Sequence, residues 1–312
     1  MTWKILLTDG LEENGQEILR QSAETVNKTG ITADELLQIV GEYDALIVRG
    51  RTKVTPAVFA AASKLKVVGR AGVGVDNIDL AAAREHKVTV VNSPIATTVA
   101  VAELTLGLML ASVREIARAD SSMKAGKWLK KEFEGAELHG KTLGVIGYGR
   151  IGSNVGTRAA AFGMKVLGYD PLVPADEIAK RGGQPVTLDE LYAQSDMITM
   201  HLPLTNDSRG MLNEASFAKM KDGVRIICAA RGGVIDEAAL LAALNSGKVA
   251  GAALDVFATE PPGLTELVSH PRVVCTPHVG AQTVEAQIRA AADISTEVLA
   301  ALDGKPLRWK VA

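Results

Sequence analysis

Short apolar runs alternate with segments of helical periodicity along almost the whole chain. This alternation is typical of α/β domains, in which helices cross between neighbouring parallel strands. In the first third of the chain, helical patterns at Ala33–Val40 and Pro56–Ala62 separate the apolar runs. We expect strands in those runs, at Ile5–Leu7, Ala45–Val48, Val67–Gly69 and Val88–Val91.

The pattern changes at Asn92-Ser93-Pro94, after which Ala96–Met123 forms one long helical pattern and Gly126–Gly140 is irregular. Apolar runs then resume, and we expect strands at Lys141–Ile146, Met164–Tyr169, Met197–His201, Val224–Ala229, Ala250–Val256 and Val273–Thr276. A final helix is expected over Val284–Leu302, returning to the first set of strands. The chain is therefore predicted to be α/β, with two doubly wound parallel-sheet domains.

A glycine-rich turn, Gly147-Tyr148-Gly149-Arg150-Ile151-Gly152, follows the first apolar run of the second set and opens a helical pattern. In such a unit the glycines allow a tight turn, close approach of a pyrophosphate and close helix packing, while the helix N-terminus supplies free amides. Asp170 ends the next apolar run, where its carboxylate can accept hydrogen bonds from a ribose and would repel a 2′-phosphate. The alternative is a glycine turn that binds no ligand. The strand before the turn, the helix after it, the second strand and Asp170 together favour a dinucleotide site. Asp170 favours NAD over NADP.

Composition and charge restrict the possible partners and compartment. A formal net charge of −2 with mixed signs gives no basis for binding nucleic acid or an anionic membrane. Cys228 and Cys275 lie in apolar runs without paired or metal-ligand spacing, which is typical of reduced, buried thiols. The N-terminal sequence lacks the long apolar region of a signal peptide, and the apolar window Leu104–Val113 is too short to span a bilayer. We expect a soluble, cytoplasmic protein without a metal ion.

The positions of the five histidines separate two of them from the rest. His86, His139 and His270 lie at a helix end, in an irregular turn and in a loop, and each is most simply a surface or turn residue. His201 and His278 instead lie at the carboxyl ends of predicted strands, the edge that carries the ligand crevice in open parallel sheets. A lone histidine there is still more often structural than catalytic.

Two charged residues at the same predicted edge change that balance in favour of His278. Glu260 follows the strand ending at Val256, and Arg231 follows the strand Val224–Ala229. A carboxylate beside an imidazole orients it and favours its protonated form, which suits a general acid/base near neutral pH. An arginine can bind a substrate carboxylate and polarise a carbonyl. Beside a nicotinamide, these groups indicate hydride transfer between a 2-hydroxy acid and its 2-keto acid.

Six segments together resemble the D-isomer-specific 2-hydroxyacid dehydrogenase family, in its order, over essentially the whole chain. They are Gly69–Asp79, Gly147–Gly152, His201–Thr205, Ala230–Asp236, Ala253–Pro261 and Pro277–Ala281. The resemblance implies a Rossmann-type NAD-binding domain, residues 94–284, inserted in a flavodoxin-like substrate (catalytic) domain, residues 1–93 and 285–312.

Further stretches are most similar to the family members that oxidise D-3-phosphoglycerate to 3-phosphohydroxypyruvate for serine biosynthesis. These stretches are Ile47–Thr55, Met123–Trp128 and Phe133–Leu138. The irregular Gly126–Gly140 segment, with Trp128 and Phe133 among charges, resembles the family's dimer-wrapping arm, so a homodimer is expected. The chain has no room after Ala312 for a serine-binding domain, so serine feedback is not expected.

The resemblance also implies a role for individual residues. Arg231, Glu260 and His278 match the catalytic trio. The cofactor would contact the glycine turn (Gly147, Gly149, Arg150, Ile151 and Gly152), with Asp170 at the adenosine ribose and the nicotinamide beside Leu202, Ala229, Ala230, Asp255, Gly280 and Ala281. The substrate carboxylate would meet the amides of Val73 and Gly74, and its phosphate would meet Arg49 and Arg51.

Departures from the family pattern keep other functions open. Ile95-Ala96-Thr97-Thr98 stands where close relatives have an Asn-containing turn, and Cys228 stands where an Asn is common. A glyoxylate or hydroxypyruvate reductase is the nearest rival, since Arg49 and Arg51 could be solvated surface charges; their spacing by two, with Lys53 beside them, favours a phosphate. A non-catalytic NAD-sensing corepressor is a third reading, which the intact catalytic trio opposes. A methyltransferase would leave the loop of His278 unexplained.

Overall fold

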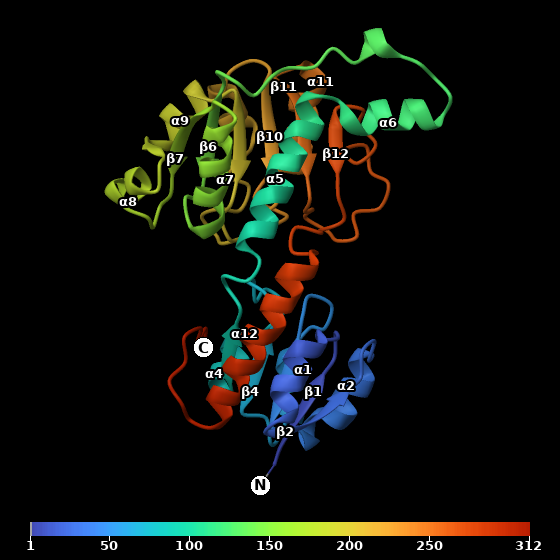
Figure 1. Ribbon diagram of the computed structural model, residues 1–312, viewed down its shortest axis with the longest axis vertical. Coiled ribbons are helices and arrows are strands. Elements are labelled where there is room, and N and C mark those ends of the chain that lie inside the picture. Colours follow the sequence, from blue (N-terminus) through green and yellow to red (C-terminus); the bar gives the residue numbers. More distant parts are fainter. Residues whose placement is uncertain (1) are drawn as a thin grey trace. The chain divides into compact units, whose positions relative to one another are not determined.

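The computed structural model describes residues 2–312, which divide into two compact units. Unit 1 comprises the chain up to Thr97 together with Ala281–Ala312, and unit 2 is Thr98–Gly280. The changeovers fall close to residues 93 and 284, where the sequence placed the domain boundaries. Each unit is a parallel sheet with helices on its faces (Figure 1). None of the helices in residues 2–312 combines the length and apolarity needed to cross a membrane.

Unit 1 contains a five-stranded parallel sheet in the order β2-β1-β3-β4-β5, which is the flavodoxin-like order. Its strands are β1 Trp3–Leu7, β2 Ala23–Asn27, β3 Ala45–Val48, β4 Val67–Arg70 and β5 Thr89–Asn92. Its helices are α1 Glu13–Arg20, α2 Ala33–Ile39, η1 Val40–Glu42, α3 Pro56–Ala61, α4 Leu80–Glu85 and α12 Val284–Leu302. Alternate residues of β1 face opposite layers: Leu6 packs with α2, α3 and α4, whereas Ile5 and Leu7 pack with α1 and α12.

Unit 2 contains a seven-stranded parallel sheet in the order β12-β11-β10-β9-β6-β7-β8. Counted from β6, this is the Rossmann order with one added strand, and the order reverses between β6 and β9. Its strands are β6 Thr142–Ile146, β7 Lys165–Tyr169, β8 Gln184–Pro185, β9 Met197–Met200, β10 Val224–Cys228, β11 Val249–Leu254 and β12 Val273–Cys275. Its helices are α5 Thr98–Val113, α6 Ile116–Lys124, η2 Lys130–Glu132, α7 Arg150–Ala161, α8 Ala175–Lys180, α9 Leu188–Gln194, α10 Glu214–Lys219 and α11 Glu237–Ser246. One apolar layer involves α5 and α7, and the other involves α9, α10 and α11.

The two edge strands β2 and β8 were not predicted. The sequence of β2, Ala-Glu-Thr-Val-Asn, contains one buried residue, and β8 is two residues long. An edge strand needs no continuous apolar run because it is less enclosed than a central strand. Hydrophobic patterning therefore identifies central strands more readily than these edges.

The prediction of one long helix over Ala96–Met123 was wrong. The structure has two helices, α5 and α6, and Glu115 between them adopts a left-handed conformation with φ 55° and ψ 31°. Helix α5 buries much of its surface in unit 2, whereas α6 buries none of its residues. Figure 1 shows α6 and the first part of the segment after it extending away from the sheet of unit 2, before that segment returns toward β6. The helical spacing of apolar residues continues from α5 into α6, so the sequence pattern does not mark the break at Glu115. That spacing also does not show which helical turns pack against a core.

Candidate active site

The glycine turn after β6 has the geometry that a pyrophosphate requires. Gly147 has φ 92°, and a Cβ there would lie 2.7 Å from the backbone of His201. A Cβ on Gly152 would lie 2.0 Å from the carbonyl oxygen of Gly147, so only glycine allows α7 to begin so close to the turn. Gly149 is the N-cap of α7 without a side-chain cap, and the space at its Cβ position is open. The first amides of α7 are thus available to an anion.

Asp170 lies directly after β7, as a ribose-binding acid should. Its Oδ1 accepts hydrogen bonds from the amides of Leu172 at 2.8 Å and Val173 at 3.1 Å. These contacts fix the carboxylate and leave Oδ2 as the oxygen for a ligand hydroxyl. The loop that follows supplies the exposed Leu172 and no cation to attract a 2′-phosphate.

Three neighbouring strands bring the predicted catalytic segments to one edge of the sheet in unit 2. Arg231 follows β10, Glu260 follows β11 and His278 follows β12, and these strands are adjacent and parallel. His278 Nδ1 lies 2.7 Å from Glu260 Oε2, and Glu260 Oε1 accepts a hydrogen bond from the amide of Phe257 at 3.0 Å. Both side chains remain accessible, with 46% of His278 and 36% of Glu260 exposed. The pair is therefore oriented and open to a ligand.

Asp255, which the sequence assigned to the nicotinamide, is engaged with the loop of His278. It is buried, and its Oδ1 accepts from Thr276 Oγ1 at 2.6 Å and from the amide of Val279 at 2.8 Å. Its Oδ2 accepts from the amide of Gly280 at 2.9 Å, and its carbonyl oxygen accepts from the amide of His278 at 2.8 Å. These bonds support the positive φ of 53° at His278. Asp255 thus shapes the loop that presents the imidazole.

The segment of Arg231 packs backbone to backbone against the loop that leads to Glu260. A Cβ on Gly232 would lie 1.7 Å from the carbonyl oxygen of Phe257, so no larger residue fits there. Arg231 is half-buried, and its Nη1 donates a hydrogen bond to the carbonyl oxygen of Ala230 at 2.7 Å. The requirement for glycine follows from this close approach, which the sequence did not reveal.

Leu202, Ala229 and Ala230 lie just after β9 and β10, as expected, but little of them is exposed. Their exposed fractions are 7%, 8% and 8%. Leu202 and Ala230 also belong to the apolar core of unit 2. Any contact they make with a nicotinamide would involve a small part of their surface.

The second strand-end histidine, His201, has a different environment from His278. Its Nε2 lies 3.0 Å from Thr199 Oγ1, and burial lowers the pKa of the imidazole to about 3. Nδ1 is buried without a hydrogen-bond partner. His201 is consequently neutral at physiological pH and unsuited to donating a proton from a charged ring.

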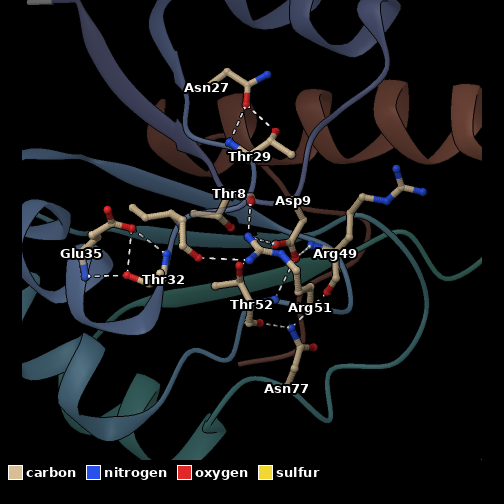
Figure 2. Close-up of polar contacts among 11 residues, drawn as sticks. Thr8, Asp9, Asn27, Thr29, Thr32, Glu35, Arg49, Arg51, Thr52 and Asn77 are labelled. Carbon is tan, nitrogen blue, oxygen red and sulfur yellow. Dashed lines mark hydrogen bonds and ion pairs between the residues drawn. The ribbon is translucent and has the colours of Figure 1, made fainter. Parts of the chain in front are cut away.

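In unit 1, Arg51 is held by its own surroundings (Figure 2). Its Nη2 donates to the carbonyl oxygen of Thr8 at 2.7 Å and lies 3.2 Å from Asp9 Oδ1, while Nη1 donates to the carbonyl oxygen of Ile31 at 3.1 Å. Asp9 is buried and also accepts from Thr52 Oγ1 at 2.5 Å. Arg51 therefore ties three segments of unit 1 together.

Arg49 points away from Arg51 in Figure 2, so the two guanidinium groups do not form a pair. Its contacts are longer: Nη1 forms an ion pair with Glu12 Oε1 at 3.4 Å, and Nη2 lies 3.5 Å from Gln282 Oε1. Distances of this length correspond to weak hydrogen bonds. Of the two arginines, Arg49 is the one whose donors are less firmly engaged.

Two asparagines that the sequence did not single out support the predicted substrate loops. Asn92 Nδ2 donates to the carbonyl oxygen of Val73 at 2.6 Å, beside the Val73–Gly74 amides. Asn77 Nδ2 donates to the carbonyl oxygens of Arg49 at 3.0 Å and Thr52 at 2.7 Å (Figure 2). Asn77 lies inside a motif of the resemblance and Asn92 begins the predicted break after Val91, but neither signal showed what the side chain would bind.

Known proteins are similar to this chain in sequence and in structure. Residues 106–280 match the family described as D-isomer specific 2-hydroxyacid dehydrogenase, NAD binding domain. D-3-phosphoglycerate dehydrogenase of Rattus norvegicus is 47% identical over 97% of this chain and 57% of its own length. A glyoxylate reductase from Paecilomyes thermophila has a TM-score of 0.91 and 32% identity, covering 99% of this chain and 98% of that one.

A D-lactate dehydrogenase from Aquifex aeolicus, solved with NAD and lactic acid, has a TM-score of 0.84 and 31% identity over 96% of each chain. The chain spans little more than half the length of the curated relatives it matches, at 57% for the rat protein, whereas it covers almost all of these two solved chains. The glycine turn, Asp170 and the His278–Glu260 pair all lie inside the matched region of unit 2. The chain belongs to the D-isomer-specific 2-hydroxyacid dehydrogenase family and carries that family's NAD-binding domain.

Proposed function

We propose that this protein oxidises D-3-phosphoglycerate to 3-phosphohydroxypyruvate with NAD, a reaction that leads toward serine. The observation that carries the proposal is the oriented pair of His278 and Glu260, 2.7 Å apart at the sheet edge that also bears Arg231. Similarity of 46–48% identity to phosphoglycerate dehydrogenases supports the substrate.

The geometry supports Nε2 of His278 as the proton-transfer atom. Because Glu260 occupies His278 Nδ1, the opposite nitrogen, Nε2, is the one free to face a substrate. In oxidation, Nε2 would accept the proton of the 2-hydroxyl group; NAD, when bound, would supply the acceptor for the C2 hydrogen as hydride. In reduction, protonated Nε2 returns that proton to the carbonyl oxygen. Glu260 stabilises the imidazolium that oxidation produces.

Arg231 would hold the substrate carboxylate and polarise the adjacent carbonyl, a role suited to a planar guanidinium. The pyrophosphate of the cofactor would lie on the open N-terminus of α7, with Asp170 Oδ2 accepting from the adenosine ribose. The amides of Val73 and Gly74 would bind the substrate carboxylate in unit 1. The substrate phosphate would bind Arg49 rather than Arg51, because Arg51 is already bound to Thr8, Ile31 and Asp9.

The rival function is reduction of glyoxylate or hydroxypyruvate, which the structural similarity to a glyoxylate reductase keeps in view. The deciding experiment is a panel of 3-phosphohydroxypyruvate, hydroxypyruvate, glyoxylate and pyruvate with NADH, scored by kcat/KM. The proposal predicts the highest value for 3-phosphohydroxypyruvate. A higher value for glyoxylate would transfer the assignment to the rival, and no turnover with any of them would favour a non-catalytic role.

A homodimer is also proposed, formed through α6 and the segment after it. Ile116, Met123 and Trp128 are exposed by 50%, 55% and 77%, and α6 contributes nothing to the core of its own unit. Apolar side chains gathered on a projecting segment are typical of an interface, and the resemblance indicates a second copy as the partner. Light scattering should give twice the 32.8 kDa chain mass at micromolar concentration; a monomer there would oppose the proposal.

A further inference from the structure

An acidic residue outside the catalytic trio holds the loop that carries Glu260. Glu237 is the first residue of α11, and its Oε1 accepts a hydrogen bond from the amide of Ala258 at 2.6 Å. Ala258 lies two residues before Glu260. A carboxylate that accepts from a backbone amide makes a charge-assisted bond, which is stronger than a bond between neutral groups.

The bond from Glu237 joins a short series of contacts that ends at the imidazole. Next to Ala258, the amide of Phe257 donates to Glu260 Oε1 at 3.0 Å, and Glu260 Oε2 lies 2.7 Å from His278 Nδ1. Moving the 257–258 backbone would therefore move the anchor of Glu260. The direction of the Glu260 carboxylate depends on how firmly that backbone is held.

The same loop is confined from a second side by the segment that contains Arg231. A Cβ on Gly232 would lie 1.7 Å from the carbonyl oxygen of Phe257, so the two backbones are already in contact. Residues 231–237 thus place Arg231 at the catalytic edge of the sheet. At the other end of the same segment, Glu237 bonds to the loop of Glu260. The segment therefore contacts the loop of Glu260 at Phe257 and Ala258 as well as supplying the arginine.

A simpler explanation is that Glu237 only complements the positive end of the dipole of α11. Asp236 already caps this helix, because its Oδ1 accepts from the amides of Ala238 and Ala239 at 3.0 Å. Glu214 occupies the matching first position of α10, after the cap Asn213. Like Glu237, Glu214 is well placed to interact with the helix dipole. Unlike Glu237, its side chain has no hydrogen bond to another loop among residues 2–312. Glu214 is consequently the matched control.

We propose that Glu237 is a positioning residue for the Glu260–His278 pair, acting through the backbone amide of Ala258. The inference rests on the proposed acid/base role of His278 and holds for whichever keto acid the panel selects. A neutral amide oxygen at this position can still accept from Ala258, so Glu237→Gln should keep most of the effect. Glu237→Ala removes the acceptor.

The test compares Glu237→Ala, Glu237→Gln and Glu214→Ala in steady-state reduction of 3-phosphohydroxypyruvate, or of glyoxylate if the panel selects it, with NADH. Because small misplacement of a catalytic group costs up to about 100-fold in rate, we expect Glu237→Ala to lower kcat by about 5- to 50-fold. KM for NADH should change by less than about 2-fold, because Asp170 and the α7 turn are untouched. Glu237→Gln and Glu214→Ala should stay within about 3-fold of wild type in kcat. Equal kcat values for Glu237→Ala and Glu214→Ala would overturn the inference.

A double-mutant cycle with His278→Ala separates positioning from general stability. If Glu237 acts through the pair, adding Glu237→Ala to His278→Ala should lower the residual kcat by less than about 2-fold. Losses that multiply would show that Glu237 acts elsewhere and would overturn the inference. Near-normal kcat in His278→Ala alone would instead remove the acid/base role itself, so the two failures are distinguishable. Thermal unfolding of each variant checks that the folded protein is being assayed.

Discussion

The edges of the two sheets carry charged residues in the same way but leave different groups available. Unit 1 places Arg49 and Arg51 after β3, and unit 2 places Arg231, Glu260 and His278 after β10, β11 and β12. In unit 2 the accessible acid and base contact each other. In unit 1 one of the two arginines is bound to carbonyl oxygens and a buried carboxylate of its own unit.

Each edge is organised by a buried aspartate just after a strand, and the partners of that aspartate explain the difference. Asp255 accepts hydrogen bonds from the hydroxyl of Thr276 and from the backbone amides of Val279 and Gly280. Asp9 accepts amides and the hydroxyl of Thr52, and it also lies 3.2 Å from the guanidinium of Arg51. The carboxylate that organises the edge of unit 1 therefore also engages a cation of that edge, which leaves Arg51 fewer donors for a ligand.

The largest expected effect tests whether the open pair of unit 2 does chemistry. His278→Ala should lower kcat by about 10²- to 10⁴-fold, the usual cost of losing a positioned acid/base. The control is His270→Ala in a loop of the same unit, where near-normal kcat is expected. Steady-state assays with saturating NADH measure both. Near-normal turnover of His278→Ala would show that the accessible pair in unit 2 is not catalytic, and the proposed difference between the two edges would be wrong.

Arg49→Ala tests whether the less engaged arginine of unit 1 binds phosphate. Loss of a charge-assisted contact should lower kcat/KM for 3-phosphohydroxypyruvate by about 10- to 150-fold. Glyoxylate carries no phosphate, so its kcat/KM should stay nearly constant. A parallel loss for both substrates would assign Arg49 a structural role and leave the phosphate without a partner in unit 1.

Arg51→Ala should affect stability more than specificity. The substitution removes donors from the carbonyl oxygens of Thr8 and Ile31 and the partner of buried Asp9. We expect the free energy of unfolding to fall by about 1–3 kcal/mol, measured by urea denaturation. Arg51→Lys should restore only part of it, since an ammonium cannot match the planar fork. A selective loss of activity toward the phosphorylated acid, at unchanged stability, would return Arg51 to the substrate site.

Asp170→Ala should give the smallest of these effects. Removing the carboxylate removes both the acceptor for the ribose and the repulsion of a 2′-phosphate, so the preference for NADH over NADPH should narrow by about 10-fold. The measurement is the ratio of kcat/KM values for the two cofactors. Asp176→Ala, at an exposed acid on α8, is the control and should leave the ratio unchanged. Wild-type protein that prefers NADPH would contradict the assignment.

Much of the fold followed from the sequence because the central strands and crossover helices have strong local signals. The apolar runs of β3, β6 and β9 and the periodicity of α12 predicted those elements closely. The glycine turn was recognisable because its spacing reflects a steric requirement that holds wherever β6 and α7 meet. The break at Glu115 and the edge strand β2 were missed, since neither is marked by a local hydrophobic pattern.

By itself the sequence determined which residues end the strands of each parallel sheet, and so which side chains gather at each edge. Only the tertiary structure decided which of them remain available. Hydrogen-bond partners come from segments distant in the chain: Arg51 is satisfied by Thr8 and Ile31, whereas Glu260 meets His278 and its loop is held by Glu237. A hydrogen bond forms only if loops from distant parts of the chain are placed to within roughly half an ångström, and no residue pattern encodes that placement.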